Sequence, residues 1–142
     1  MAGFPCQPFS AMGKQESFDD TLGRGKIFFY ILEYIICHTP KVFIFENVRG
    51  LARINKGKNL KRILRLLKQV TFNGKPAYVI KHQIMDTKEQ GIPHSRPRWY
   101  CVGIRKDASE SDSFTFPGII ECPVIEEIHW ISATNLNRST IL

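Results

Sequence analysis

The stretch Val42-Phe43-Ile44-Phe45-Glu46-Asn47-Val48 decides the fold class. Its first four residues are all apolar, which favours a short strand buried on both faces. The polar pair Glu46-Asn47 follows at the point where that strand is expected to end. Upstream, residues 27–38 carry apolar side chains at helical spacing, and Pro40 ends the helix.

Downstream, residues 59–70 form an amphipathic pattern that predicts a second helix, and residues 78–85 and 99–104 are rich in strand-forming side chains. The alternation of helices and strands predicts an α/β fold with a largely parallel sheet. Residues 1–25 are rich in Gly, Pro, Ser, Asp and Gln and are expected to form a loop. Because such a loop normally follows a strand, we expect that N-terminal strands of the sheet are missing from this chain.

Composition restricts the possible partners. The chain has 142 residues, 43% of them apolar, which is enough for the core of one domain. Its net charge of +7 suits a polyanionic partner such as nucleic acid, but it equally suits a protein that is simply basic. The apolar stretches are shorter than the roughly 20 residues that a membrane-spanning helix needs, and the N-terminus lacks a secretory signal. We therefore expect no membrane partner.

The cysteines and histidines do not form a metal-binding pattern. No two cysteines stand in a C-x-x-C pair, and the histidines are scattered. The sequence therefore predicts no metal site, and it favours a reduced, intracellular location. The cysteines are Cys6, Cys37, Cys101 and Cys122.

The segment Gly3–Ser10 contains the first candidate for chemistry. Two prolines flank Cys6 and stiffen the backbone there, which suits the mounting of a nucleophile. A buried structural cysteine is the alternative. The second candidate is Glu46, because ligands bind outside the carboxyl ends of strands in α/β sheets and a carboxyl group there can act as a proton donor. The alternative for Glu46-Asn47 is a solvated or helix-capping pair.

The third candidate is the pair Arg96 and Arg98 at the start of a strand. Side chains two residues apart in a strand project to the same face. Guanidinium groups suit carbonyl oxygens, carboxylates and phosphates. The alternative is two solvated surface arginines.

Taken in order, these segments resemble the DNA (cytosine-5) methyltransferase family. Gly3–Ser10 matches the family's GFPCQ-x-FS motif, Glu46–Val48 its ENV motif and His94–Arg98 its Q-x-R-x-R motif. Residues 18–29 resemble the family's F-x-D-x-R-G-x-L-F-F stretch, with Leu22-Gly23 as a two-residue insertion.

The resemblance extends to Phe114–Pro117, which is similar to the F-x-F-P segment before the family's target-recognition region. It implies that residues 1–117 are the catalytic part and residues 118–142 the start of the target-recognition region or an irregular tail. It also implies a partial Rossmann-like fold of S-adenosylmethionine-dependent methyltransferases, represented by the second half of the sheet.

The resemblance implies a mechanism on a cytosine flipped out of DNA. Cys6 would add to ring carbon 6, and Glu46 would hydrogen-bond or protonate ring nitrogen 3. Arg98 would hold the carbonyl oxygen of the base, while Arg96 would orient the carboxylate and the loop. Carbon 5 would then take a methyl group from S-adenosylmethionine.

Further positions are implied by the same resemblance. Pro5 and Ile27 match positions close to the methyl donor. Contacts with DNA or with the target base are implied for Gln7, Ser10, Lys14, Gln15, Asn47 and Val48. His94 departs from the family, which usually has Gln at this position.

Alternatives remain open. The family's donor-binding loop would lie upstream of this chain, so we expect the chain alone not to methylate DNA, and an inactive remnant with at most nucleic-acid binding is the second hypothesis. A tRNA-modifying branch carries Ser-Pro-Pro-Cys-Gln and is disfavoured here. The basic stretch 53–68 is interpreted as a solvated helix face in preference to a DNA surface. The location is expected to be the nucleus in a eukaryote, or the cytoplasm in a bacterium or phage host.

Overall fold

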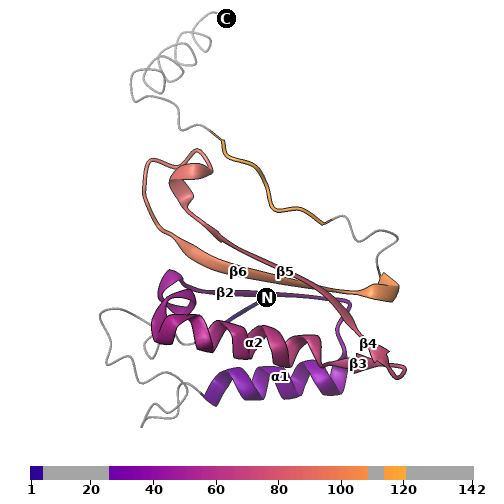
Figure 1. Ribbon diagram of the computed structural model, residues 1–142. Coiled ribbons are helices and arrows are strands. Elements are labelled where there is room, and N and C mark those ends of the chain that lie inside the picture. Colours follow the sequence, from indigo (N-terminus) through magenta and orange to yellow (C-terminus); the bar gives the residue numbers. More distant parts are fainter. Residues whose placement is uncertain (5–25, 109–113, 121–142) are drawn as a thin grey trace, which may run out of the picture. The chain divides into compact units, whose positions relative to one another are not determined.

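The structure is a computed structural model that describes residues 1–4, 26–108 and 114–120 (Figure 1). The chain divides into two compact units, one of Met1–Met85 with Pro97–Phe116 and one of Asp86–Arg96 with Pro117–Leu142. The first unit contains β1 (Ala2–Gly3), α1 (Ile27–His38), β2 (Val42–Val48), η4 (Arg49–Ala52), η5 (Ile54–Gly57), α2 (Lys58–Lys68), β3 (Thr71–Phe72), β4 (Lys75–Pro76), β5 (Tyr78–Met85), β6 (Arg98–Arg105) and η7 (Lys106–Ala108). The described part of the second unit contains η6 (Thr87–Glu89).

The main sheet has the order β1-β2-β6-β5. β1 pairs in parallel with β2, whereas β6 is antiparallel to both β2 and β5. The predicted largely parallel sheet is therefore wrong for these pairings. The connection from β5 to β6 contains only the three-residue η6 and no α-helix, whereas parallel neighbours are usually joined by a helical crossover. Because β6 lies between them, β2 and β5 still run in the same direction.

The prediction that residues 1–25 form a loop is wrong for Ala2 and Gly3. Ala2–Gly3 form β1 and pair with Phe45 and Glu46 of β2. A strand of two residues is too short to show an alternating pattern, so its pairing depends on the neighbouring strand. β2 also extends to Val48, beyond the expected end at Phe45, because its pairing with β6 continues to Arg98.

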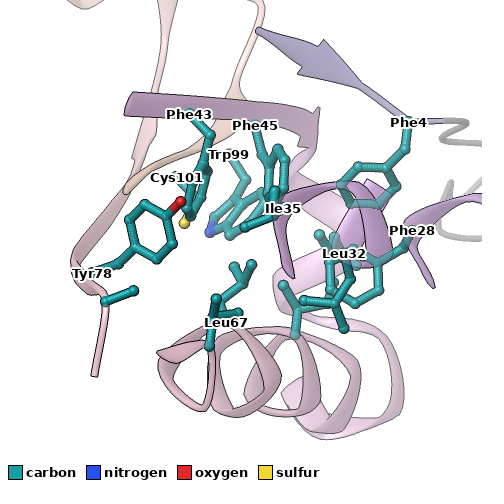
Figure 2. Packing of buried hydrophobic residues seen from close by; sticks show 14 residues of the cluster. Phe4, Phe28, Leu32, Ile35, Phe43, Phe45, Leu67, Tyr78, Trp99 and Cys101 are labelled. Carbon is teal, nitrogen blue, oxygen red and sulfur yellow. The ribbon is translucent and has the colours of Figure 1, made fainter. Parts of the chain in front are cut away.

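The core lies between the sheet and the two helices, which are on the same side of it (Figure 1). Alternate side chains of β2 are buried there, and Phe45 is 1% exposed. On the other face Val42 is exposed and Ile44 is only partly buried, so the expectation that the run Val42–Phe45 is buried on both faces is wrong. Figure 2 shows the packed side chains, which include Phe28, Leu32 and Ile35 of α1, Leu67 of α2, and Trp99 and Cys101 of β6. Each large apolar side chain buried in this way contributes about 1.5–3 kcal/mol.

Gly103 of β6 tests the packing of β6 against β2. It pairs with Phe43, and a Cβ at Gly103 would lie 2.1 Å from Cζ of the Phe43 ring. We expect Gly103→Ala to lower the free energy of unfolding by about 1–3 kcal/mol, because the ring must move inside a packed core. Urea denaturation measures the change.

Two further variants sharpen this test. Adding Phe43→Leu to Gly103→Ala removes the ring and should recover part of the loss. Gly118→Ala is the control, because a Cβ there meets nothing within 4 Å. Equal stability of Gly103→Ala and the parent chain would show that the pairing described here is wrong.

Candidate active site

Glu46 and Arg98 form an ion pair on the face of the sheet opposite the core. Arg98 Nε lies 3.0 Å from Glu46 Oε1, and the two side chains are 21% and 29% exposed for Arg98 and Glu46 respectively. The register explains the contact, because Arg98 is opposite Val48, and Val48 shares a face with Glu46. Two of the predicted site residues, far apart in sequence, are thus brought together.

The second oxygen of the Glu46 carboxylate faces β1. Glu46 Oε2 lies 3.4 Å from the position that a Cβ on Gly3 would take. The carboxylate is therefore held from β6 on one side and lies against the backbone of β1 on the other. β1 is the segment that leads directly to the cysteine motif. Sequence reasoning did not single out Gly3 for this contact, since the contact depends on the pairing of β1 with β2.

Asn47 lies on the opposite face of β2 and is only 1% exposed. Its Nδ2 donates a hydrogen bond to the carbonyl oxygen of Phe4 at 3.1 Å, and its Oδ1 accepts one from the backbone N–H of Val48 at 2.9 Å. Asn47 was predicted to contact the target base. Both hydrogen bonds described for its side chain are with the protein's own backbone, so it anchors the chain at Phe4.

Phe4 is the last described residue before Pro5 and Cys6. Its side chain is 4% exposed, and its ring packs against the rings of Phe28 and Phe45 at centroid distances of 5.8 and 6.1 Å (Figure 2). The backbone of Phe4 is thus fixed by Asn47 and its side chain by the core. Sequence reasoning missed this role of Phe4, because its partners come from other elements.

Arg96 belongs to the second unit, where Asp86 organises the local backbone. The Asp86 carboxylate accepts hydrogen bonds from Ser95 Oγ at 2.7 Å, from the N–H of Arg96 at 2.8 Å and from the N–H of Lys88 at 3.3 Å. Burial acts to raise the pKa of Asp86, but the hydrogen bonds from Ser95, Arg96 and Lys88, together with the charge of Lys88, lower this pKa overall. The side chains of Arg96 and His94 are exposed. Asp86 was also missed by sequence reasoning.

The remaining predicted positions divide into two groups. Ile27 begins α1 and is 36% exposed, and Val48 is partly buried on the face that carries Glu46. Pro5, Cys6, Gln7, Ser10, Lys14 and Gln15 lie outside the described residues.

Among the described cysteines, Cys101 is excluded as a nucleophile. Its side chain is fully buried, and burial raises its pKa to about 12, so it stays a thiol near neutral pH. The thiolate is the reactive form. Cys37 is exposed on α1.

Neither a metal cluster nor a membrane span is found in the described residues. Within residues 1–4, 26–108 and 114–120, no three His, Cys, Asp or Glu side chains are placed to hold a metal ion. None of the helices in those ranges is long and apolar enough to cross a membrane.

Comparison with solved structures identifies the class of fold. The chain is similar to the Entamoeba histolytica methyltransferase EhMeth, with a TM-score of 0.60 and 21% identity over 89% of this chain and 37% of that chain. It is also similar to DNMT2 of Spodoptera frugiperda, with a TM-score of 0.54 and 22% identity over 87% of this chain and 34% of that one. The described elements therefore share part of the α/β fold of these methyltransferases.

Comparison of sequences identifies the family. The family model for C-5 cytosine-specific DNA methylase matches residues 1–139. The Type II methyltransferase M.HpaII of Haemophilus parainfluenzae is 42% identical over 116 residues, which are 82% of this chain and 30% of that protein. M.NgoBI of Neisseria gonorrhoeae is 38% identical over 82% of this chain and 33% of its own length. The chain therefore belongs to the C-5 cytosine-specific DNA methylase family, and it spans about a third of the length of these relatives.

The anchoring role of Asn47 can be tested with Asn47→Asp. The substitution keeps the acceptor for Val48, removes the donor to Phe4 and introduces a buried charge. We expect the free energy of unfolding to fall by roughly 2–4 kcal/mol at neutral pH. The loss should shrink as the pH falls from neutral toward about 4, because burial raises the pKa of the new carboxyl above its ordinary value and the protonated group is neutral and can donate to the Phe4 carbonyl.

Urea denaturation at both pH values measures this change. Asn73→Asp, at an exposed turn position, is the matched control and should have little effect. A loss for Asn47→Asp that does not depend on pH would contradict the donor role.

The hydrogen bonds to Asp86 predict an acid transition in its loop. Because the pKa of Asp86 in the folded protein is lowered, its contribution to stability is present above the ordinary value of 3.8 and is lost as the pH falls through the lowered value. We expect the NMR signal of the Arg96 backbone amide to stay constant from neutral pH to about pH 4 and to shift below it. In Asp86→Asn this acid shift should be absent, and its persistence there would assign the transition to another group.

Proposed function

We propose that this chain carries the base-attacking centre of a DNA cytosine-5 methyltransferase, with Cys6 as the nucleophile. The observation that carries the proposal is the Glu46–Arg98 pair, which lies against Gly3, three residues before Cys6. Family membership supplies the reaction class, and DNA as the substrate follows from it as part of the proposal.

The covalent chain limits the distance between Cys6 and the anchored residue Phe4. Phe4 is fixed by Asn47 and by the core, and Cys6 follows two residues later. Two residues span at most about 7 Å, so the Cα of Cys6 stays within that distance of the Cα of Phe4. A carboxylate beside β1 is thus suited to act on the same substrate ring as Cys6.

The proposed reaction begins when the Cys6 thiolate forms a bond to ring carbon 6 of the flipped cytosine. The electrons of the 5,6 double bond move into the ring as nitrogen 3 is protonated or hydrogen-bonded by Glu46. Carbon 5 then takes a methyl group as a carbon–sulfur bond of the donor breaks. A base removes the proton from carbon 5, the double bond re-forms as the bond to Cys6 breaks, and nitrogen 3 returns its proton to Glu46.

Arg98 has donors left for the substrate. Its Nε pairs with Glu46, and Nη1 donates to the carbonyl oxygen of Pro97 at 3.0 Å. A guanidinium group carries five N–H donors, so others remain for the carbonyl oxygen of the base. We propose that Arg98 both orients Glu46 and holds the base, and that Arg96 supports the loop.

S-adenosylmethionine, when bound, would supply the methyl group. Of the two positions assigned to it, Ile27 is described, and it offers an exposed apolar side chain at the start of α1. This fits a contact with an apolar part of the donor, but it does not supply the polar groups that the rest of the molecule needs. We therefore propose that the 142-residue chain alone does not methylate DNA.

A chimera tests the assignment of the nucleophile. This chain replaces the matching segment of the Haemophilus parainfluenzae relative, and the purified chimera is mixed with S-adenosylmethionine and duplex DNA containing 5-fluorocytosine. With fluorine on carbon 5, the base has no proton to remove after methyl transfer, so Cys6 cannot be eliminated. The covalent adduct should therefore persist on a denaturing gel. We expect Cys6→Ser to abolish the adduct and Cys37→Ser, an exposed control, to leave it unchanged.

Glu46→Gln in the same chimera should slow adduct formation by roughly 10²–10⁴-fold, because it removes the group that assists nitrogen 3. Circular dichroism of each variant confirms that the chimera is folded. Undiminished adduct in Cys6→Ser would exclude Cys6 as the nucleophile. Absence of adduct from the folded parent chimera would overturn the proposed function itself.

A further inference from the structure

The positive charge of the chain is concentrated in one acid-free interval. Between Glu46 and Asp86 there is no acidic residue, and these 39 positions hold ten of the 20 lysines and arginines. Five of the ten lie on α2, and we call them the α2 basic face: Lys58, Lys61, Arg62, Arg65 and Lys68. All five are exposed.

The helix places these five side chains together. They are separated by three, one, three and three residues, which keeps them on one side of an α-helix. The opposite side carries Asn59, Ile63 and Leu67, which are buried. The α2 basic face is thus the solvent-facing side of α2, as its sequence pattern indicates. All the charged side chains on it are positive.

A single sign of charge opposes the stability of the helix. Neighbours three or four residues apart, such as Lys58 with Lys61 and Lys61 with Arg65, repel each other. Lys58 also begins the helix, where the dipole disfavours positive charge, and the first turn contains no acidic residue. A helix face that is exposed only to solvent usually carries both positively and negatively charged side chains.

Four cations of this face, Lys58, Lys61, Arg65 and Lys68, form no ion pair with other described residues. The ion pairs between described residues join Arg98 to Glu46 and Arg105 to Asp107. Arg62 lies over the ring of Phe29, at 5.2 Å from its centroid, and is left out of the test below. Burial and then the charge of Lys68 lower the pKa of His82 on β5, so the field of this face reaches the neighbouring strand.

We propose that the α2 basic face binds the phosphate backbone of duplex DNA, as a sequence-independent contact in addition to the base-binding centre. The identity of the polyanion rests on the proposed function. The charges also match in spacing. The 11 residues of α2 are about 16 Å long, and one DNA strand carries about five phosphate charges over that length, which is enough to meet Lys58, Lys61, Arg65 and Lys68 one to one.

Two variants with equal net charge test the contact. Lys58→Gln, Lys61→Gln and Arg65→Gln are combined in one variant, and the exposed residues Lys41, Lys75 and Lys106 are changed to Gln in the control. Each lowers the net charge of the 142-residue chain by three, from +7 to +4. Binding to a labelled duplex is measured by fluorescence anisotropy over a series of salt concentrations.

We expect the slope of log K against log salt to become shallower by about 2.7 for the α2 variant, at about 0.9 for each lost phosphate contact, and to stay near the parent value for the control. Equal changes in both variants would mean that binding follows net charge alone. An unchanged slope in the α2 variant would mean that the α2 basic face is exposed to solvent and does not contact DNA. Either result overturns the proposal.

Stability separates lost binding from lost structure. The α2 variant removes repulsive pairs, so its Tm should equal or exceed that of the control, and a lower Tm would contradict the argument from repulsion. Loss of binding to phosphatidylserine vesicles with an unchanged DNA slope would assign the face to membranes and overturn the proposal. Adduct formation by the chimera depends on Cys6 and not on this slope, so failure of one proposal is distinguishable from failure of the other.

Discussion

The register between β2 and β6 is the constraint on which both the core and the candidate site depend. It places Glu46 beside Arg98 on one face of the sheet and Asn47 opposite Trp99 on the face that meets the helices. A shift of one residue would exchange these faces and bury the Glu46 carboxylate in the core. Gly103 favours this register, because a Cβ at the position opposite Phe43 would lie 2.1 Å from the Phe43 ring and would force the ring to move.

The two faces of β2 have different tasks at its carboxyl end. The side-chain amide of Asn47 donates a hydrogen bond to the backbone of Phe4 and accepts one from the backbone of Val48. The bond to Phe4 anchors the chain directly after β1. Glu46 points the other way, toward Arg98 and Gly3. The anchor of the fold and the candidate proton donor are therefore adjacent residues, so displacement of one displaces the other. This coupling explains why a polar Glu-Asn pair can follow a strongly apolar run.

The sequence predicted features that depend on local pattern. The helical spacing of residues 27–38 and the strand-forming run at 78–85 correspond to α1 and β5. It could not predict the pairing of Ala2–Gly3, nor the antiparallel position of β6, because both depend on which distant strand is the neighbour. The hydrogen bond from Asn47 to Phe4 joins residues 43 positions apart, and no spacing rule indicates it.

The number of charged residues can likewise be read from the sequence, whereas their arrangement on the surface requires the structure. A net charge of +7 fits a nucleic-acid partner and a merely basic protein equally well. In the structure the cations are not spread evenly, since α2 presents a row of them at helical spacing. The acid-free interval begins directly after Glu46, whose carboxylate is held by Arg98. The chain thus keeps an acidic group where Arg98 can hold it, and the following 39 positions, which contain the α2 basic face proposed to bind DNA, hold no acidic residue.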